Sequence, residues 1–254
     1  MDNAVAMARL QLAPRPVSAW RAQQALWFCS FVALGLFLLL TVAVSLAGQP
    51  YFSSDLPVSR AVQSISWPGF EQTMLGISLA GDNLFWSSAL VATACVAVLA
   101  LRAWRAAAVL LGVVLVGQVL KISVKDFIGR PRPASDVVRV LIDAKEIYSF
   151  PSGHTVHYTA FFGFLWFITF ALAKARALRW PLLSVWTGLI LGVGLARIYL
   201  GAHWVSDVMG GYLLGGAVLA AGIGLFRVWS SQGDRLRAAT SSDGGLKASP
   251  KHSS

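Results

Sequence analysis

Residues 26–47 have the sequence LWFCSFVALGLFLLLTVAVSLA, a run of 22 residues without a charged side chain. About 20 apolar residues in a helix are enough to cross the hydrocarbon core of a bilayer. The whole chain of 254 residues is 56% hydrophobic and 13% charged, which is too apolar for a soluble domain of this length. These features predict an all-α polytopic membrane protein with a six-transmembrane-helix bundle. The five other predicted spans are 84–101, 105–124, 156–174, 181–200 and 205–227.

The segments around these spans suggest a simple domain organisation. Residues 1–25 are predicted to be an N-terminal segment, and 26–229 the six-span membrane domain. A cleaved signal peptide is the alternative for the first span, but its 22 residues exceed the about 7–15 of a signal core and favour an uncleaved anchor. Residues 230–254 are rich in Ser and Gly and are predicted to be a disordered tail. Residues 55–66 have apolar side chains at helical spacing, which predicts a short amphipathic helix on the membrane surface.

The Lys and Arg residues are divided unevenly between the two predicted faces of the membrane. With six spans both termini lie on one face, which carries thirteen of the 21 Lys and Arg residues. The positive-inside rule therefore predicts that both termini are cytoplasmic, in the plasma (inner) membrane of the cell. The loops after the third and fifth spans then face outward together. This distribution accounts for most of the net charge of +10, so we expect no nucleic-acid partner.

Three cations lie near the outward ends of the predicted spans. Lys125 and Arg132 follow the end of the third span, and Arg197 lies near the end of the fifth. Together they would neutralise a phosphoryl dianion, for which the planar fork of Arg is well suited because it binds two oxygens at once. Charged residues at span ends usually have partners or a function. Lys121, by contrast, is predicted to be an ordinary interfacial side chain that extends toward the head groups.

Ser152, Gly153 and His154 lie where the fourth span begins. Ser is a good N-cap, and the first backbone N–H groups of a helix point toward an anion. Gly153 would let the backbone approach that anion closely. His154 would then be placed to give a proton to a leaving oxygen. His157, one turn further, is expected to pack within the bundle.

His203 and Asp207 are four residues apart, so both are expected on one face at the start of the sixth span. A carboxylate bonded to one ring nitrogen fixes the tautomer and leaves the other nitrogen free as a nucleophile. The same spacing also suits a metal site. Three cations predicted at the same place disfavour a divalent metal there.

These clusters resemble the signature of the type 2 phosphatidic acid phosphatase superfamily. That group includes lipid phosphate phosphatases, bacterial undecaprenyl-diphosphate phosphatases and vanadium haloperoxidases. Its signature is Lys-x6-Arg-Pro, then Pro-Ser-Gly-His, then Ser-Arg-x5-His-x3-Asp. Residues 125–133 match the first part, 151–154 the second and 197–207 the third. Ala196 departs from the usual Ser, and the resemblance covers about 80–227.

The resemblance implies a mechanism. His203 would attack phosphorus and form a phosphohistidine, Asp207 would orient it, and His154 would protonate the leaving oxygen and later activate water. No metal and no cofactor are implied. The residues that would hold the phosphoryl oxygens are Lys125, Arg132, Ser152, Gly153 and Arg197.

Other functions use similar residues. A transporter or channel would carry its charges along a pathway at the midplane, whereas these charges share one face. Haloperoxidase relatives are soluble, unlike this composition. A lipid phosphotransferase would use the same phosphohistidine and is not separated from a hydrolase by sequence. The expected substrate is a lipid phosphate or pyrophosphate, with undecaprenyl diphosphate first and phosphatidylglycerophosphate and phosphatidic acid next. The sequence leaves the oligomeric state open.

Overall fold

The computed structural model describes residues 17–79, 81, 84–142, 146–173 and 175–246. Over these residues the chain forms eight α-helices, which confirms the all-α prediction. Their bounds are α2 Val17–Leu46, α3 Asp55–Gln63, α4 Phe70–Leu79, α5 Leu84–Ala100, α6 Trp104–Ile128, α7 Gly153–Leu172, α8 Arg176–Tyr199 and α9 Val205–Leu246.

Five of these helices, α2, α6, α7, α8 and α9, are long and apolar enough to cross a membrane. Each overlaps a predicted span, although α2 begins at Val17, within the predicted N-terminal segment 1–25. The remaining predicted span, 84–101, corresponds to α5, whose 17 residues are fewer than the other five helices have. At 1.5 Å per residue α5 is about 25 Å long, slightly less than the about 30 Å of a hydrocarbon core.

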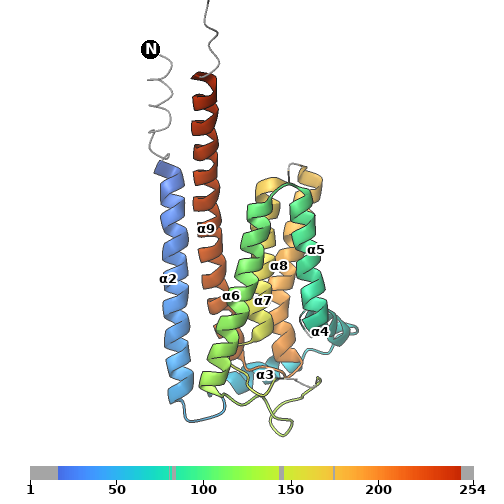
Figure 1. Ribbon diagram of the computed structural model, residues 1–254. Helices are drawn as coiled ribbons and strands as arrows, with labels where there is room; N and C mark the ends of the chain where they lie inside the picture. The colour runs from blue at the N-terminus through green and yellow to red at the C-terminus, as the bar shows by residue number, and fades with distance from the viewer. Residues whose placement is uncertain (1–16, 80, 82–83, 143–145, 174, 247–254) are drawn as a thin grey trace, which may run out of the picture.

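The long helices run alternately up and down in the bundle (Figure 1). Helix α2 lies antiparallel to α9, because the Gln23 amide donates to the carbonyl of Gly224 at 3.1 Å and the Ser30 hydroxyl to that of Ala217 at 2.9 Å. The start of α2 and the end of α9 therefore share one end of the bundle. At the opposite end lie α3, the loop after α6, and the first turns of α7 and α9 (Figure 1).

Helices α7 and α9 pack very closely at that second end. A side chain added at Gly211 would lie 2.9 Å from the carbonyl oxygen of Ser152, and one at Gly215 would lie 2.9 Å from that of Val156. Small residues at this four-residue spacing let two helix backbones approach each other. The first turn of α7 is thereby held against the first turn of α9.

Helix α3 confirms the prediction of a short helix within 55–66, but its polar side faces the protein. Asp55, Ser59 and Gln63 recur every four residues and are buried, whereas Val58 is 43% exposed. The Gln63 amide donates to the carbonyls of Arg139 at 2.7 Å and Tyr199 at 3.0 Å. The buried stripe is polar because its partners are loop carbonyls and charged side chains.

Helix α9 is longer than predicted. Residues 230–246, which were expected to be disordered, continue α9 as far as Leu246. The Arg, Leu and Ala residues of this segment favour a helix and it contains no Pro to break one, although its Gly and Ser residues are weak helix formers. Residues 247–254 of the predicted tail, and 1–16 of the predicted N-terminal segment, lie outside the described residues.

Candidate active site

The three predicted clusters meet at the end of the bundle that carries α3. The backbone N–H of Ser152 donates to the carbonyl of Asp207 at 3.0 Å, which joins the starts of α7 and α9. The backbone N–H of His203 donates to the carbonyl of Arg197 at 3.2 Å across the turn between α8 and α9. Gly201 makes this turn possible, because it has a φ of +70° and a side chain there would collide with the carbonyl oxygen of Arg139.

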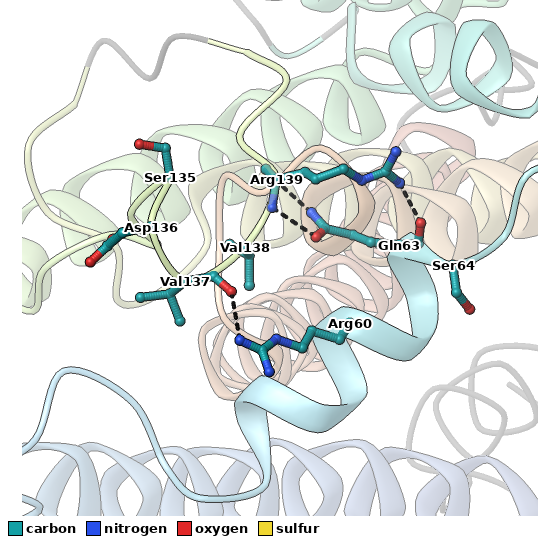
Figure 2. A pocket seen from close by; sticks show the side chains of 8 residues that line it. All are labelled: Arg60, Gln63, Ser64, Ser135, Asp136, Val137, Val138 and Arg139. Atoms are coloured by element: carbon teal, nitrogen blue, oxygen red, sulfur yellow. Dashed lines mark hydrogen bonds between the residues drawn. The ribbon is translucent and has the colours of Figure 1, made fainter.

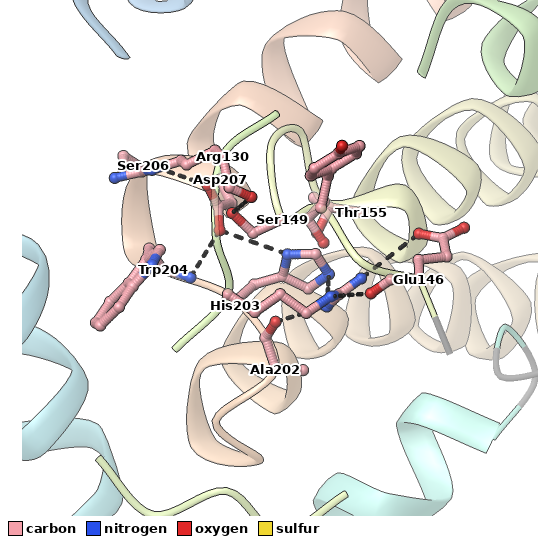
Figure 3. A network of polar contacts seen from close by, with 12 residues as sticks. Arg130, Glu146, Ser149, Thr155, Ala202, His203, Trp204, Ser206 and Asp207 are labelled. Carbon is pink, nitrogen blue, oxygen red and sulfur yellow. Dashed lines mark hydrogen bonds and ion pairs between the residues drawn. The ribbon is translucent and has the colours of Figure 1, made fainter. Parts of the chain in front are cut away.

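His203 is buried, and its two ring nitrogens face different groups (Figure 3). Nδ1 lies 3.5 Å from Oδ2 of Asp207, and that oxygen accepts the backbone N–H of Trp204 at 2.9 Å. Nε2 lies 3.2 Å from Nη1 of Arg132. Because Arg132 can only donate, the tautomer that fits has its proton on Nδ1 toward Asp207 and a lone pair on Nε2. Nε2 is therefore the nitrogen that can act as a nucleophile.

The surroundings keep the His203 ring neutral. Burial lowers the pKa of His203 well below its usual value, and the charges of Arg132, Lys125 and Arg197 lower it further. His154 also lowers this pKa by its charge. All three predicted cations and the second histidine thus lie close enough to His203 to act on it electrostatically.

Three cations converge on one carboxylate beside His203, and we call Lys121, Lys125, Arg132 and Glu146 the cation cluster. Lys125 Nζ lies 2.7 Å from Oε2 of Glu146, and Arg132 Nη2 lies 3.5 Å from the same oxygen. Lys121 Nζ lies 3.1 Å from Oε1. Burial alone would raise the pKa of Glu146, but the charges of Lys125 and Lys121 outweigh it and hold that pKa at about 2. The cluster is therefore an anion site that a carboxylate occupies.

Lys121 differs from its predicted role as an interfacial side chain. It is buried and lies against the start of α7, where a side chain added at Gly153 would be 2.8 Å from Nζ. Gly153 thus leaves room for a cation beside the first backbone amides of α7. The spacing of four residues between Lys121 and Lys125 is the sequence signal that could have paired them on one helix face.

Arg132 is held in place by backbone carbonyls. Its Nε donates to the carbonyl of Glu146 at 2.6 Å and its Nη1 to that of Ala202 at 2.7 Å. Burial lowers the pKa of Arg132, but the side chain remains a cation because its ordinary pKa is so high. The guanidinium is consequently fixed between the carboxylate of Glu146 and the ring of His203.

Arg197 is buried in the last turn of α8 and connects to α4. Its Nη1 donates to the hydroxyl of Ser78 at 2.6 Å. The neighbouring Ala196, where the family signature has Ser, lies in an apolar cluster with Phe70 and Met74 of α4. A methyl group suits that position, and a hydroxyl reaches Arg197 from Ser78 instead.

Ser152 and His154 lie at the start of α7, as predicted. Ser152 is the N-cap residue of α7, but its side chain makes no capping hydrogen bond. Its hydroxyl accepts a bond from the Thr155 hydroxyl at 2.9 Å. His154 is half-buried, and its ring lies directly against Gly81. The ring of His157 stacks on Phe161 with centroids 5.5 Å apart, which agrees with a packing role.

A buried network behind His203 was not predicted, and we call Asp55, Arg130, Ser206 and Asp207 the carboxylate network. Arg130 Nη1 lies 2.6 Å from Oδ1 of Asp207 (Figure 3). Its Nη2 lies 2.9 Å from Oδ2 of Asp55. Ser206 donates to Asp55 through both its backbone N–H and its hydroxyl. Arg130 lies inside the first motif, whereas Asp55 belongs to a helix expected only to lie on the membrane surface.

A separate hollow of about 360 Å³ lies between α3 and the loop after α6 (Figure 2). Its polar groups bond to one another: Arg60 donates to the carbonyl of Val137 at 3.2 Å, and Arg139 to that of Gln63. The hollow therefore marks where the loop is fastened to α3. It contains neither histidine of the site.

The metal alternative for His203 and Asp207 needs a third ligand. Among the residues that the structure describes, no three His, Cys, Asp or Glu side chains gather as a metal site. The oxygens of Asp207 are instead bonded to Arg130 and the Trp204 backbone. The arrangement suits phosphoryl transfer to a ring nitrogen.

Comparisons with known proteins agree with this geometry. Residues 102–230, about half of the chain, match the PAP2 superfamily. Phosphatidylglycerophosphatase B of Bacillus subtilis is 28% identical over 72% of this chain and 88% of its own length. Decaprenylphosphoryl-5-phosphoribose phosphatase of Mycobacterium tuberculosis is 31% identical over 65% of this chain and 86% of its own.

A solved structure of a PAP2-type phosphatase has a similar fold. The crystal structure of the transmembrane PAP2-type phosphatidylglycerolphosphate phosphatase of Bacillus subtilis superposes with a TM-score of 0.66 and 25% sequence identity. The match covers 78% of this chain and 96% of that protein. Taken with the helices that can cross a membrane, these matches show that the chain belongs to the PAP2 superfamily and is an integral membrane lipid phosphatase.

Proposed function

We propose that the enzyme removes a terminal phosphate from a membrane lipid at the outer face of the plasma membrane, through a phosphohistidine on His203. The observation that carries this proposal is the position of Nε2 of His203, 3.2 Å from Arg132, beside an anion site formed by three cations. A phosphoryl group that replaces the Glu146 carboxylate would meet the lone pair of Nε2.

The proposed topology has six spans: the five long apolar helices and the shorter α5, which is the second span along the chain. A short span is tolerated because the bilayer thins locally and flanking side chains reach the interface. The start of α2 and the end of α9 share one end of the bundle, as an even number of spans requires (Figure 1). The uneven distribution of Lys and Arg supports cytoplasmic termini. The site end would then face outward, with α3 at the interface.

In the proposed reaction, Nε2 of His203 attacks phosphorus while the bond from phosphorus to the lipid oxygen breaks. His154 gives its proton to that oxygen, and Asp207 stabilises the positive charge that develops on the His203 ring. His154 then removes a proton from water, which attacks the phosphohistidine and releases inorganic phosphate. The phosphoryl oxygens are held by Lys125, Arg132, Arg197, Ser152 and the Gly153 amide.

The printed names of the relatives help to choose substrates. One name describes a phosphatidylglycerophosphatase and the other a phosphatase of a decaprenylphosphoryl phosphoribose. Both names refer to a lipid that carries a phosphoryl group and a further phosphate. Undecaprenyl diphosphate, the first choice from the sequence, shares this feature. We therefore propose a lipid with two phosphate groups, and phosphatidylglycerophosphate is the first to test.

A panel assay tests the proposal. Purified protein in detergent micelles is given phosphatidylglycerophosphate, undecaprenyl diphosphate and phosphatidic acid, and inorganic phosphate is measured. Release from the first two lipids above phosphatidic acid supports the proposal, and release from none contradicts it. Transfer of labelled phosphate to an added lipid alcohol without release of inorganic phosphate would identify a phosphotransferase.

Metal independence is tested in the same assay. We expect EDTA to leave activity unchanged, because the cations of the site are side chains. Vanadate should inhibit, because its trigonal-bipyramidal form resembles the phosphoryl group in transit. Loss of activity in EDTA that a divalent metal restores would contradict the proposed mechanism.

A further inference from the structure

The carboxylate of Asp207 has three partners, two at one oxygen and one at the other. Its Oδ2 faces His203 and accepts the backbone N–H of Trp204, which is three residues earlier. This is the backward reach that a carboxylate makes at the third position of a helix. Its Oδ1 accepts Nη1 of Arg130 at 2.6 Å. The rotamer that presents Oδ2 to the nucleophile is therefore fixed by Arg130.

Arg130 is itself held on every side. Its Nη2 donates to Oδ2 of Asp55 at 2.9 Å, its Nε to the carbonyl of Pro50 at 3.0 Å, and its Nη1 also to the hydroxyl of Ser206 at 2.7 Å. Its planar fork thus spans two carboxylates, a geometry that a Lys ammonium cannot reproduce. Arg130 and both carboxylates are buried, so none of the three can exchange its partner for water without cost.

Asp55 adds a second function at the same point. Its Oδ1 accepts the backbone N–H of Ser206 at 2.8 Å, which is one of the first amides of α9. Helix α9 is therefore capped by a carboxylate that comes from α3, far away in the sequence. A displacement of α3 would move Asp55, Arg130 and the start of α9 together.

Charge balance separates Arg130 from the phosphate-binding cations. Arg130 is paired with Asp55 and Asp207, whereas Arg132 and Lys125 share one half-exposed carboxylate, that of Glu146, among the residues that the structure describes. An incoming phosphate can displace Glu146 from its cations. It has no comparable access to Arg130, whose charge is already neutralised inside the protein.

We propose that Arg130 and Asp55 are positioning residues, which hold Asp207 so that it orients and stabilises the His203 nucleophile. This inference rests on the proposed function. It adds α3 to the catalytic apparatus, although α3 provides no group that touches the substrate.

The test separates positioning from phosphate binding and from simple instability. We expect Arg130→Gln to lower kcat by about 10²-fold while KM changes less than about twofold, because Asp207 acts only as charge develops on His203. In an Asp207→Asn background the same substitution should cost less than about threefold, because two residues that act as a unit are not additive. Arg130→Lys should recover only part of the loss. Arg176→Gln, the same change on an exposed residue in the first turn of α8 at the other end of the bundle, is the control.

Folding is checked by elution as a single species and by the upward shift of Tm that inorganic phosphate produces through the intact cation cluster. Should Arg130→Gln fail to fold, Asp55→Asn and Ser206→Ala decide the matter, since each removes bonds from the network without removing Arg130. A fall in kcat at constant KM supports the inference. It is overturned if KM rises tenfold at constant kcat, if kcat is unchanged, or if the cost persists fully in Asp207→Asn. If the wild-type enzyme releases phosphate from no lipid, the proposed function fails instead.

Discussion

Two polar networks lie on either side of His203, and they differ in how they satisfy their charges. In the cation cluster the carboxylate of Glu146 is 46% exposed and comes from a loop. In the carboxylate network the side chains of Asp55 and Asp207 are 2% and 0% exposed and come from helices. Both networks pair Arg with carboxylates, but only the first one borders solvent.

This difference suits the cation cluster to binding a phosphate and the carboxylate network to holding Asp207 in position. An ion pair beside solvent loses less than a buried one when its partner is exchanged, so the Glu146 carboxylate can give way to a phosphate, which offers the cations more acceptor oxygens. Removal of one partner from a buried pair leaves an uncompensated charge and costs about 3–5 kcal/mol. The carboxylate network therefore remains fixed while the cation cluster changes partners. Four predictions test this contrast, in order of decreasing effect.

The largest effect is expected where the fixed network meets the nucleophile. His203→Ala should reduce phosphate release by about 10⁴-fold or more, and Asp207→Asn by about 10²–10⁴-fold, because without either group the phosphohistidine does not form efficiently. Phosphate release from phosphatidylglycerophosphate in micelles measures both. His157→Ala is the matched control for His203→Ala, since that ring stacks on Phe161 and is assigned no chemistry. Near-normal turnover by His203→Ala would end the nucleophile assignment.

The next effect is expected in the cation cluster. Arg132→Gln should lower kcat/KM by about 10²–10³-fold, comparable to the loss of an oxyanion donor, and should raise KM as well as lower kcat. The rise in KM distinguishes it from Arg130→Gln, which is expected to act on kcat alone. Kinetics with phosphatidylglycerophosphate measure this, with Arg176→Gln, an exposed Arg at the other end of the bundle, as the control. An unchanged KM would mean that Arg132 does not hold the phosphate.

The sequence predicted most of the helices and most of the residues on the cation-cluster side of His203. The helices follow from long apolar runs. The predicted cations Lys125, Arg132 and Arg197 lie close enough to His203 for their charges to lower its pKa. Each lies at the end of a span, and spans that alternate in direction bring such ends to one face. Their catalytic roles remain predictions.

The carboxylate network and the position of Glu146 could not be predicted from the sequence, for physical reasons. Asp55 contacts Ser206 across 151 residues, and the pairing depends on how α3 packs rather than on any local pattern. The buried face of α3 is polar, although the apolar spacing suggested the opposite orientation. Glu146 lies in a loop with no periodicity, so nothing in the sequence linked it to Lys121 or Lys125.

A smaller effect is expected when the exchangeable anion itself is removed. Glu146→Gln should make inorganic phosphate a better inhibitor by about tenfold, because the phosphate no longer competes with a carboxylate for Lys121 and Lys125. The inhibition constant in the micelle assay measures this. Asp136→Asn, the same type of change on an exposed residue of the same loop, is the control. Weaker inhibition would instead mean that Glu146 helps to hold the phosphate.

The smallest effect concerns pH. Burial and then the charge of Arg132 lower the pKa of His203, so the ring stays neutral and nucleophilic as the pH falls through 6.5. Arg132→Gln removes one of these influences, and the pKa of His203 should therefore rise. The acid limb of kcat/KM, which reports the free enzyme, should move to higher pH by up to about one unit. Measurement from pH 5 to 9 compares both enzymes on one lipid, so that ionisation of the substrate cancels between them. Arg176→Gln, the same change on an exposed residue far from the site, should move neither limb. A shift of the acid limb to lower pH would mean that His203 is not the group that must be neutral.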